Sequence, residues 1–214
     1  MRHRAATVGL LLVAMVSLSG CFTGKRPSVV SDPFPAGALT GDPAIDQVLN
    51  ELDNINPGPY TADYTVLTKF GNVTRPANVA VDHTRRSVTV GTVRFLTLDN
   101  NVRHTCLLDK PDPCSTSLDP ARISDAQLTP DFYAADAAKR LRRDAVSKIA
   151  TTVSHIEIIA GRSTTCVDVP LTGGTSIFCV LKGGPLARLD DAAVSINLTQ
   201  FSAAADETLF NTSK

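Results

Sequence analysis

The chain has 214 residues, and its 21 Lys and Arg balance 21 Asp and Glu, so the formal net charge at pH 7 is zero. A balanced charge argues against nucleic acid as a partner, because binding to phosphates normally shows as a basic excess. Hydrophobic residues make up 43% of the sequence, aromatic residues only 5%, and Trp is absent. This length fits one domain, whose core must consist mainly of Val, Ile, Leu and Ala.

The first residues have the organisation of an export signal. Arg2 and Arg4 form a short basic segment, and an apolar run over 6–16 follows it. Small residues then lead to Leu18-Ser19-Gly20-Cys21, which is typical of a bacterial lipobox. In this class the signal is cut before the cysteine, and the cysteine thiol carries a diacylglycerol with acyl chains such as palmitate. The sequence therefore predicts lipidation at Cys21.

This N-terminus also sets the expected domain organisation and location. We expect residues 1–20 to be a lipoprotein signal peptide, 21–41 a lipidated flexible tether rich in Pro, Gly and Ser, and 42–214 a single domain. The protein would lie on the extracytoplasmic face of the cell membrane, held by acylated Cys21. An ordinary signal peptide with a chance cysteine is the alternative. A transmembrane helix is disfavoured because the apolar run is shorter than the ~20 residues that span a bilayer.

Four cysteines remain once Cys21 is acylated, and we expect two local disulfides. Cys106 and Cys114 flank a Pro-containing segment, and Cys166 and Cys179 flank the turn-like sequence Leu171-Thr172-Gly173-Gly174. Four cysteines allow three pairings. In a hairpin centred between Thr172 and Gly173, residues 166 and 179 would face each other, close enough for a disulfide. A zinc site is the alternative, but it lacks a C-x-x-C pair, and thiols of exported proteins become oxidised.

Two helices stand out from the pattern of apolar residues. Asp42-Pro43 is a sound start signal, and residues 45, 48, 49, 52 and 55 repeat at helical spacing. Thr129-Pro130-Asp131 opens the second helix in the same way. Its expected buried stripe is Ala134, Ala138, Leu141, Ala145 and Ile149, and its expected basic outer face is Lys139, Arg140, Arg142, Arg143 and Lys148. That face is interpreted as solvated, with anionic lipid headgroups as a less favoured partner.

The remaining segments favour β-strands. Short β-branched runs cover 60–70, 77–83, 87–98 and 101–108, with a turn signal at Arg75-Pro76, and further runs cover 155–160, 163–169, 175–181, 186–190 and 193–201. Connections this short fit an antiparallel meander. Residues 111–128 lose the pattern and are expected to form an ordered loop. The fold class is therefore α+β: a single curved antiparallel sheet, or half-barrel, with two main helices packed on its concave face.

The sequence contains no convincing catalytic or cofactor motif. A triad could be assembled from a Ser, an Asp and His104 or His155, but no G-x-S-x-G elbow is present. Gly173-Gly174 and Gly183-Gly184 do not open helices and are interpreted as hairpin turns rather than phosphate loops. We expect no catalysis, no metal and no cofactor.

The order of elements resembles that of a known family. The segments Ile158–Gly161, Phe178–Leu181 and Val194–Phe201 look like the closing sheet of the LppX/LprG-type lipoproteins of actinobacteria, which share a half-barrel fold with the carrier LolA. The resemblance implies an apolar cavity for acyl chains between sheet and helices, and carriage of lipids or lipoglycans without catalysis. The two cysteine pairs depart from that family's pattern.

The sequence thus leads to one main functional hypothesis and one alternative. The main hypothesis is a non-catalytic, membrane-anchored lipoprotein that binds or carries a lipid or other hydrophobic ligand in the cell envelope, as a monomer. The alternative is a structural or interaction lipoprotein with a filled core that contacts the cell wall or a protein partner. The sequence identifies no ligand-binding residue.

Overall fold

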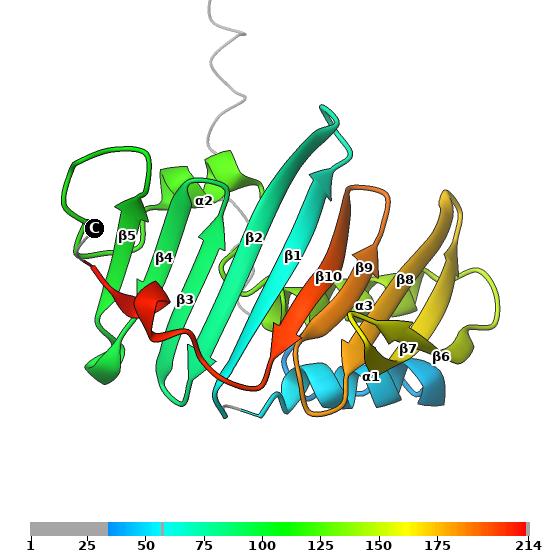
Figure 1. The fold of residues 1–214 in the computed structure, drawn as a ribbon. Coiled ribbons are helices and arrows are strands. Elements are labelled where there is room, and N and C mark those ends of the chain that lie inside the picture. Colours follow the sequence, from blue (N-terminus) through cyan, green and yellow to red (C-terminus); the bar gives the residue numbers. More distant parts are fainter. Residues whose placement is uncertain (1–33, 57, 213–214) are drawn as a thin grey trace, which may run out of the picture. The chain divides into compact units, whose positions relative to one another are not determined.

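In a computed structural model of the chain, residues 34–56 and 58–212 are described (Figure 1). The predicted lipobox and Cys21 lie outside these residues, as does most of the predicted tether. None of the helices in the described ranges is long and apolar enough to cross a membrane.

The described residues form one sheet of ten strands in which every neighbouring pair is antiparallel. The strands are β1 (Tyr60–Thr68), β2 (Val73–Asp82), β3 (Arg85–Val90), β4 (Val93–Thr97), β5 (Arg103–Leu107), β6 (Val153–Ile159), β7 (Arg162–Leu171), β8 (Gly174–Leu181), β9 (Leu186–Asp190) and β10 (Val194–Ser202). Their order is β5-β4-β3-β2-β1-β10-β9-β8-β7-β6. Each half of the sheet is thus a meander of consecutive strands, and the two halves meet where β1 pairs with β10.

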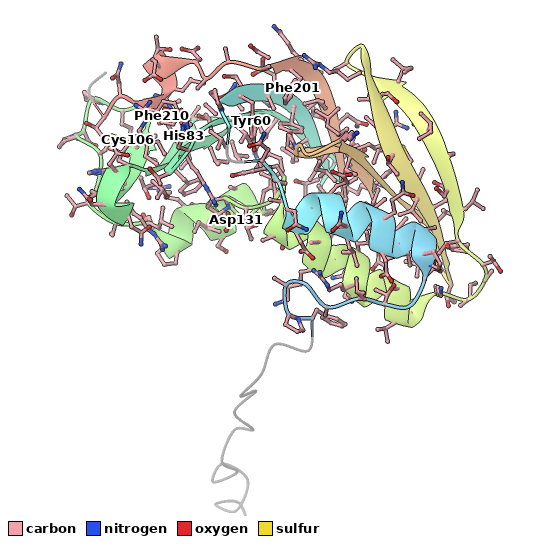
Figure 2. All side chains as sticks on the ribbon, turned by 90° about the horizontal axis from the view of Figure 1, so that it is seen from below. Tyr60, His83, Cys106, Asp131, Phe201 and Phe210 are labelled. Atoms are coloured by element: carbon pink, nitrogen blue, oxygen red, sulfur yellow. A yellow bond between two sulfur atoms is a disulfide. The ribbon has the colours of Figure 1, made fainter. Side chains whose placement is uncertain are left out.

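Helices cover one face of this sheet. They are α1 (Pro43–Asp53), α2 (Pro120–Ala126) and α3 (Ala135–Ser147), and short 3₁₀ turns occur at η1 (Asp99–Asn101) and η2 (Glu207–Phe210). Figure 2 shows the sheet bending around the helices, with Asp131 on the helix side and Phe210 on the opposite side. The predicted α+β class, with a single curved antiparallel sheet and helices on its concave face, is confirmed.

Helix α1 begins where the sequence predicts. The Asp42 carboxylate accepts hydrogen bonds from the backbone N–H groups of Ala44 and Ile45 at 3.1 and 3.4 Å, and Pro43 occupies the first helical position. Residues 45, 48, 49 and 52 are buried against the sheet, as their spacing predicts. Residue 55, predicted to share this face, lies beyond the end of the helix and is only partly buried.

The second predicted helix begins later than expected. Thr129-Pro130-Asp131 forms a turn, and α3 starts only at Ala135. The Asp131 carboxylate lies 3.6 Å from the Arg86 guanidinium instead of capping a helix. The turn lets Phe132 and the adjacent Tyr133 insert into the core, where both side chains are buried. Burying two aromatic rings outweighs the local start signal, since each removes a large apolar area from water.

The expected faces of this helix are also wrong in part. Ile149, predicted to be buried, lies beyond the helix and is 65% exposed. Arg142, predicted on the outer face, is 4% exposed and forms an ion pair with Asp53 of α1. Lys148, likewise predicted outside, forms an ion pair with Asp42. Helix α1 packs beside α3. The helix and its N-cap supply these carboxylates, and the pattern of one helix alone cannot show them.

Two strand boundaries differ from the prediction. Pro76 lies inside β2 rather than in a turn. It comes just before residue pairing with β3 begins at Ala77, where a missing N–H is tolerated. The predicted run over 87–98 is a hairpin, since β3 and β4 are separated by a turn at Gly91. The φ of Gly91 is +58°, which glycine adopts readily.

The segment 111–128 contains an unpredicted helix, so three α-helices replace the expected two within the described residues. In α2 the Asp119 carboxylate accepts from the backbone N–H groups of Ala121 and Arg122, and Pro120 is the first helical residue. This is the same Asp-Pro signal that starts α1. The helix is only seven residues long, too short to show an apolar period.

The core between the sheet and α1 and α3 is filled. Phe132, Phe178 and Leu141 are fully buried there, and the hydroxyl of Tyr64 donates to the carbonyl of Leu186 at 2.9 Å. Burial raises the pKa of Tyr133 to about 12, so its phenol stays protonated. Within the described residues, the side chains between the sheet and these two helices form one packed cluster.

The end of the predicted tether packs against α1. The backbone N–H of Thr40 donates to Asp46 at 2.7 Å, and that of Gly37 donates to Asp53 at 3.1 Å. The carbonyl of Ala38 accepts from Arg142 at 2.9 Å. Residues 37–41 are therefore part of the folded unit.

Candidate functional site

The structure joins the four described cysteines in the two predicted pairs. Cys166 and Cys179 are direct cross-strand partners in the β7–β8 hairpin, with Cα atoms 4.0 Å apart. Cys106 at the end of β5 is joined to Cys114, with Cα atoms 4.3 Å apart. The predicted hairpin centre between Thr172 and Gly173 is confirmed by the pairing of Leu171 with Gly174.

A group of potential metal ligands surrounds one disulfide. The ligand atoms of His155, Glu157, Cys166 and Cys179 lie within 4.8 Å of one another. Both sulfurs are bonded to each other, so neither is available as the thiolate that zinc requires. The Glu157 carboxylate is also held by Arg188 at 2.6 Å. The described residues therefore give no support to the zinc alternative while the disulfide is intact.

The two histidines considered for a triad lie on strands at opposite edges of the sheet. His104 on β5 contacts the carbonyl of Ser115 through Nδ1 at 3.0 Å. His155 on β6 lies 3.9 Å from Asp168. Among the described residues, neither imidazole is hydrogen-bonded to a serine hydroxyl. The absence of catalysis remains a prediction.

A hollow with an apolar floor lies where α2, rather than α1 or α3, covers the sheet. We call it the α2 cleft; its volume is about 760 Å³, within the range of small-molecule sites. It is lined by His83, Thr84, Arg86, Val88, Phe95, Thr97, Asn100, Asn101, Arg103, Leu118, Ile123, Pro130 and Asp131. Strands β3 to β5 form one side, and the segment containing α2 forms the other.

The floor of the α2 cleft is apolar. Val88 and Phe95 are direct cross-strand partners on β3 and β4, and both are buried. Leu118 and Ile123 approach from the other side and are half-buried. These side chains provide an apolar surface that a hydrocarbon segment can cover.

A row of polar side chains runs beside this floor on the same face. Arg86 pairs with Thr97 across β3 and β4, and Thr97 pairs with Arg103 across β4 and β5. The two arginine backbones are thus about 10 Å apart, or two interstrand spacings. Arg86 forms an ion pair with Asp131 at 3.6 Å, whereas Arg103 makes no ion pair within the described residues. The cleft therefore combines an apolar floor with a cationic rim.

A second hollow, of about 530 Å³, lies over the loops at the ends of β1, β8 and β10. Tyr60 stacks on Phe201 with ring centroids 5.8 Å apart, and the Arg162 guanidinium lies 4.9 Å from the centre of the Phe201 ring. Gly183 in this hollow is tied to α1, since its N–H donates to Glu51 at 2.5 Å. Loops and turns form much of the wall of this hollow. Its aromatic rings already stack on each other or on Arg162.

Sequence reasoning did not find the α2 cleft. Its residues come from β3, β4, β5 and the segment 118–131, and no local motif links them. The Asp119-Pro120 signal could have revealed α2. The cationic row could only have been found after the register of β3, β4 and β5 was known, because it is a cross-strand feature.

No protein-family model matches the chain, and no curated protein matches it by sequence. A crystal structure of MucB aligns with a TM-score of 0.47 and 12% identity, over 80% of this chain and 63% of that one. The Pseudomonas aeruginosa MucA/MucB complex aligns with a TM-score of 0.42 and 16% identity, over 78% and 60%. A domain from Vibrio parahaemolyticus described as an outer membrane lipoprotein-sorting protein gives 0.30 and 9%, over 77% and 95%.

This chain thus spans less than two thirds of the MucB chain, at 63% of its length. Likenesses of this size assign no family and carry no activity from one protein to the other. The resemblance to LppX/LprG-type lipoproteins stays a prediction from the sequence.

Proposed function

We propose that this protein is a non-catalytic, lipid-anchored lipoprotein of the extracytoplasmic membrane face that binds an amphiphilic lipid in the α2 cleft. The observation that carries the proposal is the apolar floor of Val88 and Phe95 beside the row that contains Arg86 and Arg103. A hydrocarbon segment would cover the floor, and a negatively charged headgroup would bind the arginines. Lipidation at Cys21, inferred from the lipobox, would hold the cleft close to such ligands.

The filled core under α1 and α3 restricts where this ligand can bind. The sequence-based hypothesis placed acyl chains between the sheet and its two main helices, and that space is occupied by side chains such as Phe132 and Phe178. In the described part of the chain, the α2 cleft is a hollow on the concave face of the sheet. The cleft suits one short or partly inserted acyl chain better than a lipid that is completely enclosed.

The test uses the Cys21→Ser protein, so that its own acyl chains do not interfere. Native mass spectrometry should show co-purified lipid, and calorimetry should show binding of a short-chain phosphatidylglycerol. Ile123→Glu places a carboxylate against the apolar floor and should weaken binding at least about tenfold, or ~1.4 kcal/mol. Arg103→Gln should weaken binding of phosphatidylglycerol more than that of the matching phosphatidylcholine.

The matched control is Val146→Glu, since Val146 on α3 is 78% exposed and does not line the cleft. It should bind both lipids like the parent protein. The proposal is wrong if the parent protein binds neither lipid, or if Ile123→Glu binds both with unchanged affinity while its thermal unfolding shows that it is folded.

A further inference from the structure

The two edge strands of the sheet differ in whether another segment covers their outer side. At the β5 edge, Ser115 forms a bridge with Thr105, and its backbone N–H donates to the Thr105 carbonyl at 2.9 Å. At the other edge, β6 is the last strand, and no described residue pairs with its outer side. Natural proteins usually protect such an edge with charge, proline, a bulge or a covering segment, because an unpaired strand is a template for another chain.

Strand β6 carries little of the usual protection along its outer side. It has seven residues, Val153–Ile159, without proline or lysine. Ile156 and Ile158 share one face of the strand and are 66% and 67% exposed. These side chains leave apolar surface in water directly at an open edge.

The direction of the free backbone groups follows from the contact with β7. The hydroxyl of Thr164 donates to the carbonyl of Glu157 at 2.8 Å, so the Glu157 carbonyl points toward β7. Backbone groups alternate in direction along a strand. Ser154, Ile156 and Ile158 therefore present their N–H and C=O groups outward, where another strand could exchange hydrogen bonds with all three residues.

The side chains of β6 are complementary to a second copy of themselves. If two β6 strands pair antiparallel around a two-fold axis at Ile156, His155 of each copy lies opposite Glu157 of the other. Residue 154 then faces 158, and 153 faces 159. The outward-pointing residues 154, 156 and 158 all fall into hydrogen-bonded pairs, and the His–Glu pairs fall between them, where side chains are closest.

Neighbouring registers lack this complementarity. An axis at residue 155 would place His155 opposite His155, and an axis at residue 157 would place Glu157 opposite Glu157. Like charges directly opposite each other are destabilising in a sheet. Of these three registers, the axis at Ile156 alone both alternates the charges and pairs the outward backbone groups.

Existing ion pairs extend the alternation across the axis. Arg188 binds Glu157 at 2.6 Å, and Asp168 lies 3.9 Å from His155. A dimer would therefore order the groups as Arg188, Glu157, then His155 and Asp168 of the second copy, so that each basic side chain lies beside a carboxylate. We propose that β6 is a homodimerisation edge, at which two copies form one continuous antiparallel sheet around an axis at Ile156.

This inference is independent of the α2 cleft, and it replaces the monomer expected from the sequence. The test is sedimentation of the Cys21→Ser protein over a range of concentrations, where a monomer–dimer equilibrium is expected. Ile156→Lys places two ammonium groups at the axis and should leave only monomer. Val146→Lys, which exchanges a comparably exposed residue on α3, should dimerise like the parent.

A charge exchange separates pairing at this edge from a general effect on folding. His155→Glu alone opposes two carboxylates across the axis. Glu157→Lys alone replaces the carboxylate that faces His155 by an ammonium group. Each variant should therefore be a weaker dimer. Mixed in equal amounts, they should form a heterodimer, because the carboxylate introduced at position 155 of one variant then faces the ammonium introduced at position 157 of the other. Thermal unfolding of each variant checks that it is folded.

Three results would overturn the proposal. The first is a parent protein that stays monomeric at all concentrations, including one that binds an extended peptide at β6 instead. The second is a dimer that Ile156→Lys leaves intact. The third is a mixture of folded His155→Glu and Glu157→Lys proteins that associates no better than either variant alone.

Discussion

Arg142 on α3 and Asp53 on α1 form an ion pair that is almost completely removed from water, with side chains 4% and 14% exposed. The same guanidinium donates to the carbonyl of Ala38 at 2.9 Å, and Asp53 accepts from the backbone N–H of Gly37 at 3.1 Å. One pair of charged residues therefore joins both main helices to the segment that precedes them.

Arg142→Met should destabilise the protein by about 3 kcal/mol, because it leaves the Asp53 carboxylate buried without its partner. Chemical denaturation measures this change. Arg122→Met, which removes an arginine from an ion pair with the exposed Asp125 of α2, should cost less than about 1 kcal/mol. Equal losses in the two variants would contradict a special role for the buried pair.

Asp42 should make stability depend on pH. Burial raises its pKa, but hydrogen bonds from Lys148, Thr152 and the backbone of Ile45 outweigh burial, so the pKa lies below its ordinary value. A depressed pKa stabilises the fold above the unfolded value of ~3.9, and this stabilisation is lost as the pH falls through the lower, folded value.

Asp42→Asn keeps an oxygen for the helix cap but removes the charge that binds Lys148. Its free energy of unfolding should be about 1–2 kcal/mol lower than that of the parent at pH 7. The difference should shrink as the pH falls through the lowered, folded pKa of Asp42, because the parent's carboxyl is then protonated as well. Urea titrations at several pH values measure it, and a difference that is constant with pH would exclude the charge as its cause.

Replacing Cys166 and Cys179 together by Ala should lower stability by about 2–3 kcal/mol, as expected for a closed loop of this length. The hairpin lies in the half of the sheet opposite the α2 cleft, so lipid binding should survive better than thermal stability. Peptide mapping without reduction should recover 166 with 179, and 106 with 114. Crossed pairs, or free thiols at all four positions, would contradict the structure.

Cys21→Ser should release the protein from the membrane fraction without unfolding its domain. The reason is that the proposed anchor is the acylated thiol, whereas the described fold begins at residue 34. Fractionation followed by immunoblotting measures the distribution, and circular dichroism checks the fold. A protein that stays wholly in the membrane fraction would indicate an uncut apolar helix.

The architecture was predictable where the signal is local. The Asp42-Pro43 cap and the hairpin that joins Cys166 to Cys179 follow from neighbouring residues, and the structure has both. The start of α3 was not predictable in this way, because Phe132 and Tyr133 reach core contacts that are made by distant strands. The burial of Arg142 was not predictable for the same reason, because its partner Asp53 lies on another helix.

The α2 cleft was not predictable from the sequence because its residues come together only through the register of β3, β4 and β5. Arg86, Thr97 and Arg103 become a row only when three strands align, and no spacing along the chain contains that information. The β6 edge is similar. Its residues read as an ordinary strand, and they become notable only because the topology leaves this strand last in the sheet.

The sheet order has a consequence for folding kinetics. Within each meander, strands pair with their neighbours along the chain, whereas the central β1–β10 pair joins segments far apart. The hydroxyl of Thr199 on β10, for example, donates to the carbonyl of Asp63 on β1 across 136 residues. Closing so long a loop is entropically unfavourable before its contacts form. The two meanders are therefore expected to fold early as separate units, and their joining at β1 and β10 to be the slow step. Substitutions at that seam should alter the refolding rate, while those at the outer hairpins should mainly alter the unfolding rate.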